Sequence, residues 1–266
     1  MNKVLAFIFV LLPLTAFAQS DDFGFDLSAE AVKKLSRNAS FAIEGNVRTQ
    51  DNTSAIERYG IGGAFEFKFL NTKKLDIEAT AGWEHIWQHH LSNAEEKYKS
   101  DGMTLKGRNI SDSYVQPRHR TTVSIAGAYS PNKRWTFIIK ESVQHNHYNA
   151  IDSIGVTKER FLMDGDGNQI VSSEEDMKQK GSRDRMVLRS KATVKYDIRR
   201  SHFVPFVSFD YGLGLNYTAF KRKFIVGTDY KLSKTNKVTA FYRFQTENDD
   251  DEPNGHIVGL SYSIKL

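Results

Sequence analysis

The sequence predicts an all-β fold, an antiparallel up-and-down transmembrane β-barrel of about 10–12 strands with short periplasmic turns and longer extracellular loops. Three observations predict it. The chain begins with the pattern of a secretion signal, and apolar and polar residues then alternate with a period of two in segment after segment. The polar positions of these segments carry Glu, Asp, Lys and Arg in mid-strand, which suit a wet lumen better than a dry core.

The N-terminus has the three parts of a signal peptide in order. Lys3 supplies the charge, Val4 to Leu14 form an apolar run, and Ala16-Phe17-Ala18 is a small-residue cleavage site. A retained transmembrane helix is the alternative, but the run is shorter than the roughly 20 residues that a span needs. The predicted organisation is a signal peptide over residues 1–18 and one barrel domain over residues 19–266.

Composition narrows the class further. The mean hydropathy of −0.50 excludes a helical membrane protein, yet it suits a barrel because every second strand residue faces water. There is no cysteine, so neither a lipoprotein anchor nor a disulfide framework is expected. The net charge of +5 comes from interspersed acidic and basic residues, so the sequence predicts no nucleic-acid partner.

About eleven candidate strands follow the signal, each with an apolar stripe that points to one side. In the first, Phe25, Leu27, Ala29 and Ala31 alternate with polar residues. The stripes begin, in chain order, at Phe25, Phe41, Tyr59, Leu75, Val123, Trp135, Leu188, Phe203, Phe224, Val238 and Val258. Short turns rich in Asn, Ser, Lys and Arg separate pairs of strands at residues 35–38, 71–74, 130–133, 199–202 and 233–236.

Two other connections are long and polar, Leu91 to Ser113 and Ala150 to Ser182. Outer-membrane barrels keep short turns in the periplasm and long loops outside, so the terminal residue Leu266 is expected on the periplasmic side. Bacterial barrels have even strand numbers. Eleven therefore implies that one strand is miscounted, or that Asp21 to Leu35 forms a plug or a short extra strand.

A soluble periplasmic sandwich or lipocalin-like barrel is the competing fold. Aromatic residues close to the turns and loops favour the membrane barrel, because an interfacial girdle places them there; they are Trp83, Tyr129, Trp135, Phe203 and Tyr211. Glu141 interrupts one apolar stripe, which a membrane barrel tolerates only near the outer interface.

The polar faces predict a narrow lumen. Its predicted lining is Glu44, Glu66, Lys68, Glu78, Arg120, Lys140, Lys191, Lys195, Asp210, Asp229 and Arg243. Opposed charges there either brace the wall or form a selective conduit.

A candidate metal site lies in the second long segment. Asp164, Asp166, Asn168, Ser172 and Glu175 fit most ligand positions of a calcium loop, where a hard cation needs closely spaced oxygens. The position that needs Gly for a sharp turn is Gln169. The alternative is a plain hairpin tip, since Asp-Gly and Gly-Asn are favoured turn pairs. Calcium is the only cofactor that the sequence suggests.

Histidines gather near the expected extracellular ends. His85 and His89 share one strand face, as do His145 and His147, at spacings that suit a metal site or a His–carboxylate pair across strands. Ordinary interfacial rings are the alternative. No nucleophile accompanies them, so the sequence does not favour an enzyme. The acidic segment at residues 248–254 is read as a solvated loop that could also hold a cation.

Several stretches resemble a domain-of-unknown-function family of small Gram-negative outer-membrane proteins. They are Tyr230 to Lys234, Tyr242 to Gln245, Glu247 to Leu260, Arg58 to Gly63 and Ala31 to Leu35. The resemblance implies a β-barrel in the outer membrane and no particular activity. The chain departs from the pattern at Leu266, where such barrels commonly end on an aromatic residue.

The predicted function is that of a small outer-membrane barrel without an assigned activity, either a narrow or closed porin-like barrel or a surface platform. The alternatives are a ligand- or calcium-binding module built on the long loops, and an outer-membrane hydrolase with a His–carboxylate site. The expected partners are outer-membrane lipid, lipopolysaccharide and the barrel-assembly machinery.

Overall fold

The computed structural model describes residues 22–100, 104–164, 167–248 and 254–266. The predicted signal peptide lies outside these residues. No helix in the described part of the chain is long and apolar enough to cross a membrane.

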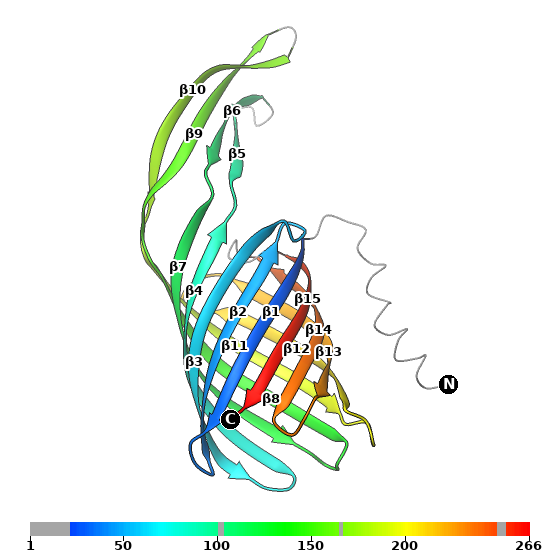
Figure 1. The fold of residues 1–266 in the computed structure, drawn as a ribbon. Helices are drawn as coiled ribbons and strands as arrows, with labels where there is room; N and C mark the ends of the chain where they lie inside the picture. The colour runs from blue at the N-terminus through cyan, green and yellow to red at the C-terminus, as the bar shows by residue number, and fades with distance from the viewer. Residues whose placement is uncertain (1–21, 101–103, 165–166, 249–253) are drawn as a thin grey trace, which may run out of the picture.

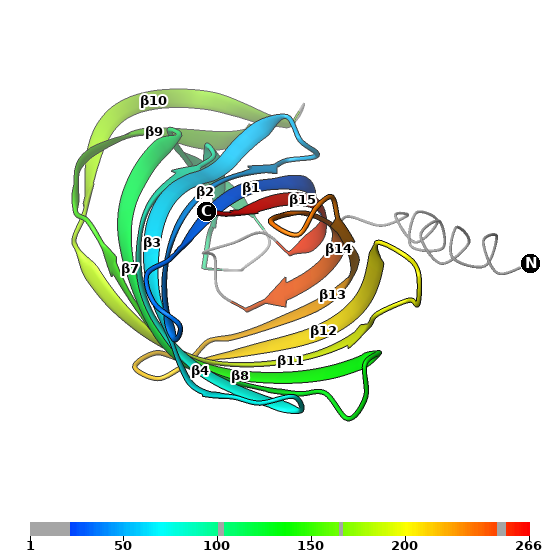
Figure 2. The same ribbon diagram turned by 60° about the horizontal axis from the view of Figure 1, so that its bottom comes forward.

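Eleven strands of the described chain close into a barrel (Figures 1 and 2). Neighbours in the wall follow the order β1-β15-β14-β13-β12-β11-β8-β7-β4-β3-β2. These strands are β1 (Asp22–Lys34), β2 (Ala39–Gln50), β3 (Ala55–Asn71), β4 (Leu75–His90), β7 (Tyr114–Tyr129), β8 (Trp135–Tyr148), β11 (Arg183–Tyr196), β12 (Phe203–Gly214), β13 (Phe220–Lys231), β14 (Asn236–Glu247) and β15 (Gly255–Lys265). The predicted count of eleven is confirmed, whereas the expectation of an even number is wrong.

The barrel closes between its first and last strands. In an up-and-down wall with an odd number of strands these two run in the same direction, so β1 pairs with β15 in parallel, from Asp22 opposite Gly255 to Val32 opposite Lys265. Gly255 permits the close approach, because its φ is 149° and a Cβ there would lie 2.0 Å from the Asp22 carbonyl oxygen. The wall is therefore mixed and not wholly antiparallel. Of the segment predicted as a plug or a short extra strand, Asp22–Lys34 is a full strand of the wall.

The two long polar segments are strands, not irregular loops. They form β5 (Asn93–Tyr98), β6 (Leu105–Ser111), β9 (Ile151–Asp164) and β10 (Gly167–Lys180). These make a separate sheet in the order β10-β9-β6-β5, here called the projecting sheet, which extends beyond one end of the barrel (Figure 1). Both segments leave the same end of the wall, as predicted.

The five predicted short turns lie at the opposite end, with the C-terminus (Figure 1). Small polar side chains stabilise these turns by accepting hydrogen bonds from backbone N–H groups. Asn132 Oδ1 accepts from the amides of Arg134 and Trp135 at 2.9 and 3.1 Å. Thr72 Oγ1 accepts from the amide of Leu75 at 2.9 Å.

Side-chain polarity is reversed relative to a soluble core. Among the described residues only eight hydrophobic side chains are buried, against nineteen polar or charged ones. The predicted apolar stripes instead cover the outside. Their exposed members include Phe25, Leu27, Phe41, Ile43, Tyr59, Ile61, Phe65, Phe67, Trp83, Val123, Ile125, Trp135, Phe137, Ile139, Phe203, Val207, Phe209, Leu213, Phe224, Leu260 and Tyr262.

Glu141 corrects one detail of the predicted wall. It lies midway along β8 and not near a strand end. Ser190 on the neighbouring strand β11 donates its hydroxyl to Glu141 Oε2 at 2.6 Å. A hydrogen bond across the wall thus accompanies this carboxylate among apolar neighbours, which lowers the cost of placing it there.

Candidate functional site: a charged cavity inside the barrel

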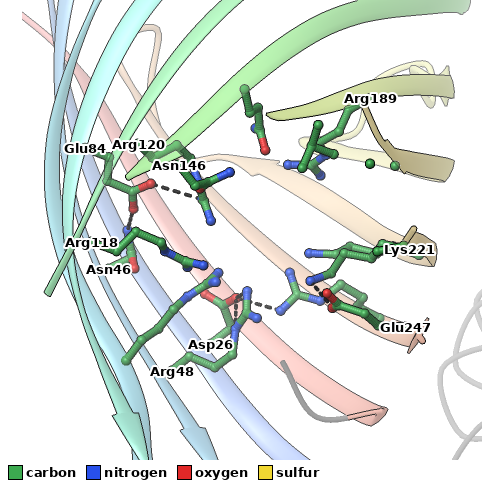
Figure 3. A pocket seen from close by; sticks show the side chains of 18 of the residues that line it. Asp26, Asn46, Arg48, Glu84, Arg118, Arg120, Asn146, Arg189, Lys221 and Glu247 are labelled. Carbon is green, nitrogen blue, oxygen red and sulfur yellow. Dashed lines mark hydrogen bonds and ion pairs between the residues drawn. The ribbon is translucent and has the colours of Figure 1, made fainter. Parts of the chain in front are cut away.

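A cavity of about 390 Å³ lies in the interior of the barrel, enclosed by the wall strands (Figure 3). Eight cationic and four acidic side chains line it, so its lining carries an excess of positive charge. The cations are Arg48, Arg58, Arg118, Arg120, Arg189, Lys221, Lys223 and Arg243, and the acids are Asp26, Glu44, Glu84 and Glu247. They come from strands on all sides because every second residue of each strand points inward.

Asp26 joins three strands at one side of this cavity. Arg48 of β2 donates to Asp26 Oδ2 through Nη2 at 3.0 Å and through Nε at 3.2 Å. Arg243 of β14 donates to the same oxygen at 2.8 Å. Arg48 also lies 3.5 Å from Glu57, which points inward because a β-bulge beside Arg48 shifts the register of β2 and β3.

Glu84 organises the neighbouring part of the wall. Its carboxylate accepts from Asn46 Nδ2 at 2.7 Å and from Arg120 Nη1 at 3.2 Å. Arg120 Nε donates to Asn146 Oδ1 at 3.0 Å, so four strands hold this network (Figure 3). The guanidinium group of Arg120 is thereby fixed at the cavity surface.

Positive charge concentrates around Tyr148, near the end that carries the projecting sheet. Arg118, which is 2% exposed, donates from Nη1 to the Tyr148 hydroxyl at 2.9 Å. The guanidinium groups of Arg118, Arg183 and Arg185 lie 5.2, 4.5 and 5.6 Å from the centre of the Tyr148 ring. Cation–π attraction stabilises this grouping of like charges.

A smaller cavity of about 190 Å³ adjoins the first and shares Glu44, Asn46, Glu84 and Arg120 with it. Its lining adds the acids Glu30 and Glu66 and the cation Lys140. Four acidic and two cationic side chains line the smaller cavity in total, so its charge balance is opposite to that of the larger one.

The predicted lumen residues point inward. Glu44, Arg120 and Arg243 line the larger cavity, and Glu66 and Lys140 line the smaller one. The others are placed as follows: Asp210 and Asp229 are buried, Lys195 donates to Asp229, Lys191 is half-buried, and Lys68 lies 3.9 Å from Glu78.

Sequence reasoning missed several cavity residues. Arg118 could have been found by continuing the alternation of Val123 and Ile125 toward the start of that strand. Lys221 and Lys223 stand on either side of Arg222. Since Phe224 belongs to an outward apolar stripe, the alternation along the strand turns Lys221 and Lys223 inward and Arg222 outward. Glu57 carries no such signal, because the bulge breaks the alternation.

The predicted calcium residues lie on the β9–β10 hairpin. Asp164 pairs with Gly167 at its tip, Ser172 lies opposite Arg160, and Glu175 lies opposite Thr157. Asp166 lies outside the described residues, as do the side-chain positions of Asp164 and Asn168. Calcium binding stays a prediction, and calorimetric titration of the native chain and a Glu175→Gln variant tests it.

The hairpin carries an exposed ion pair of its own. Lys158 Nζ donates to Asp176 Oδ2. This hydrogen bond lowers the pKa of Asp176, helped by a backbone amide, and raises the pKa of Lys158. Within the described residues, no group of three or more His, Asp or Glu side chains is already arranged to hold a metal ion.

The comparisons with known proteins give only weak structural likeness. No family model matches the chain, and no curated protein is similar to it in sequence. Among solved structures, it is similar to a mutant of the ferric enterobactin receptor PfeA from Pseudomonas aeruginosa, with 9% identity and a TM-score of 0.19. The alignment covers 80% of this chain, which spans only 40% of the receptor chain. At this TM-score the likeness supports no inference about function.

Proposed function

We propose that this chain is an integral outer-membrane β-barrel that binds small anionic solutes in its cationic cavity. The observation that carries the proposal is the reversed polarity of the wall, with apolar side chains outside and an excess of Arg and Lys inside. Each half of the proposal has its own support and its own experiment.

The outer surface supports the membrane half. Soluble monomers rarely expose contiguous apolar patches above a few hundred Å². Here exposed Phe, Leu, Ile and Val residues recur on strand after strand around the barrel. The wall strands are 11–17 residues long, which meets or exceeds the roughly 9–11 residues that a tilted transmembrane strand needs.

The lining supports the anion half. Guanidinium groups recognise carboxylate and phosphate through paired hydrogen bonds, and their charge attracts anions into a confined space. A volume of about 390 Å³ falls in the range of small-molecule sites. The expected ligand is a small solute with a carboxylate or phosphate group.

Buried side chains narrow the interior toward the end that carries the projecting sheet. Gln116 and Gln245 are fully buried, and Arg48 and Arg118 are nearly so. We therefore propose a binding barrel with a constricted lumen and not a wide general pore.

Fractionation and gel mobility test the membrane half. The chain should appear in the outer-membrane fraction and migrate faster on a denaturing gel before boiling than after it. Recovery in the soluble periplasmic fraction would favour a soluble barrel and overturn this half of the proposal.

Calorimetry of the detergent-solubilised barrel with inorganic phosphate and with citrate tests the anion half. We expect binding that Lys223→Gln weakens about tenfold, because one cation leaves the cavity while Arg189 still pairs with Asp210. Lys231→Gln is the control, since this cation pairs with Asp197 at the short-turn end and is half exposed. Absence of binding, or equal losses in both variants, overturns the anion half.

A surface platform is the second candidate. The projecting sheet favours it, because in the described part of the chain its strands pair only with each other, and they extend beyond the barrel. In either case we propose that the outer face contacts lipid and lipopolysaccharide and that the barrel-assembly machinery inserts the chain. Membership of the small outer-membrane family stays a prediction.

A further inference from the structure

The outer face of the barrel carries a row of four titratable side chains on adjacent strands. His85 of β4 is paired in register with His119 of β7, His119 with His147 of β8, and His147 with Asp184 of β11. All four lie toward the end of the wall that bears the projecting sheet. We call them the histidine row.

Two members of the row already converge. His85 Nδ1 lies 3.2 Å from His119 Nδ1, and the ring centres are 4.5 Å apart. Two nitrogens bound to one tetrahedral zinc ion at 2.0–2.1 Å are about 3.3 Å apart, so this spacing suits a chelating pair. Trp83 stacks on His119 at 5.7 Å, and Trp87 meets His85 edge-on at 4.1 Å, which restricts both rings.

The other two members have the arrangement that orients a metal-binding imidazole. His147 Nδ1 lies 2.9 Å from Asp184 Oδ1, and His145 Nε2 lies 3.0 Å from the same oxygen. When His147 donates its Nδ1 proton to this carboxylate, the lone pair is on Nε2. A carboxylate behind a histidine is the common support of metal ligands.

We propose that His85, His119 and His147 bind a divalent transition-metal ion such as Zn²⁺ on the outer face of the barrel, with Asp184 as a positioning residue. His147 supplies the third ligand through Nε2, after its side chain and that of Asp184 turn together toward His119, so that the hydrogen bond between His147 Nδ1 and Asp184 is kept. This is within reach because directly opposite residues on paired strands have Cβ atoms about 4.5–5.5 Å apart. Solvent fills the fourth position.

Zinc content and titration of the detergent-solubilised chain, purified without an oligohistidine tag, test the site. We expect one zinc ion per chain. The variant His85→Gln/His119→Gln should lose this stoichiometric binding. His202→Gln is the matched control, because His202 lies at the short-turn end, where its Nδ1 is 2.9 Å from the Lys231 carbonyl oxygen. Heat-modifiable gel mobility confirms that each variant is folded.

Two further variants test the remaining roles. His147→Gln should weaken zinc binding at least tenfold, and Asp184→Asn should weaken it by about 10–100-fold while still saturating at one ion. Cobalt substitution adds a spectroscopic readout, since tetrahedral and octahedral sites absorb differently. Absence of bound metal in the native chain, or full binding by the folded His85→Gln/His119→Gln variant, overturns the site and leaves the His85–His119 contact as a simple hydrogen bond.

Discussion

Single carboxylates hold the charged interior together, and Asp26 is the clearest case. It accepts from Arg48 on one neighbouring strand and from Arg243, which lies beyond β15 on β14. Two more side-chain contacts cross the closing pair of strands. Ser28 donates to Ser261 at 2.9 Å, and Ser263 donates to Glu30 at 2.9 Å. The seam is therefore reinforced from inside the barrel.

Replacement of Asp26 tests this reinforcement. Asp26→Asn removes the negative charge shared by Arg48 and Arg243, both nearly inaccessible to solvent. Loss of one partner of a buried ion pair costs about 3–5 kcal/mol of the free energy of unfolding. Urea titration in detergent, followed by gel mobility, measures it.

Asp197→Asn is the matched comparison for that measurement. Asp197 pairs with Lys231, but both side chains are more than 40% exposed. Exposed pairs contribute about 0–1 kcal/mol. Equal destabilisation by the two substitutions would show that the buried ion pairs of Asp26 contribute no more to the free energy of unfolding than an exposed pair does.

At the scale of elements, the sequence predicts the wall better than what projects from it. The turn at residues 35–38 separates β1 from β2 as expected, because polar turn residues interrupt two clear alternations. The sequence predicts loops for β9 and β10 because charges occupy both faces of each strand, as at the adjacent residues Lys158 and Glu159 on β9 and Glu175 and Asp176 on β10. Exposure of both faces of a strand removes the period-two signal.

Removal of β9 and β10 should show that the wall folds without these two strands of the projecting sheet. Among the residues that the structure describes, the sheet's backbone hydrogen bonds join β5, β6, β9 and β10 to each other and to no wall strand. We expect that replacing residues 150–181 with an Asn-Gly turn keeps the barrel folded, because Tyr148 still pairs with Arg183. Retained heat-modifiable mobility is the measurement. Deletion of β15, which closes the wall, is the negative control and should abolish the shift.

For the whole molecule, the count of eleven could be predicted from alternation alone, but the closure could not. Pairing between β1 and β15 joins residues more than 200 positions apart, and no local pattern marks it. The candidate site has the same limit. Inward parity identifies Arg120 or Arg243 as lumen residues, but only the closed wall brings their strands around one cavity.

The parallel seam also separates the two ends of the barrel chain. In a barrel with an even number of strands, the first and last residues of the wall meet at one rim. Here Asp22 and Lys265 lie at opposite rims, because β1 starts beside the start of β15 and both run the same way. In the proposed outer-membrane barrel, epitopes placed before Asp22 and after Leu266 should therefore report opposite sides of the membrane. Antibody binding to intact cells should detect the first epitope and miss the second, and a circular permutation that joins the two ends should fail to close the wall.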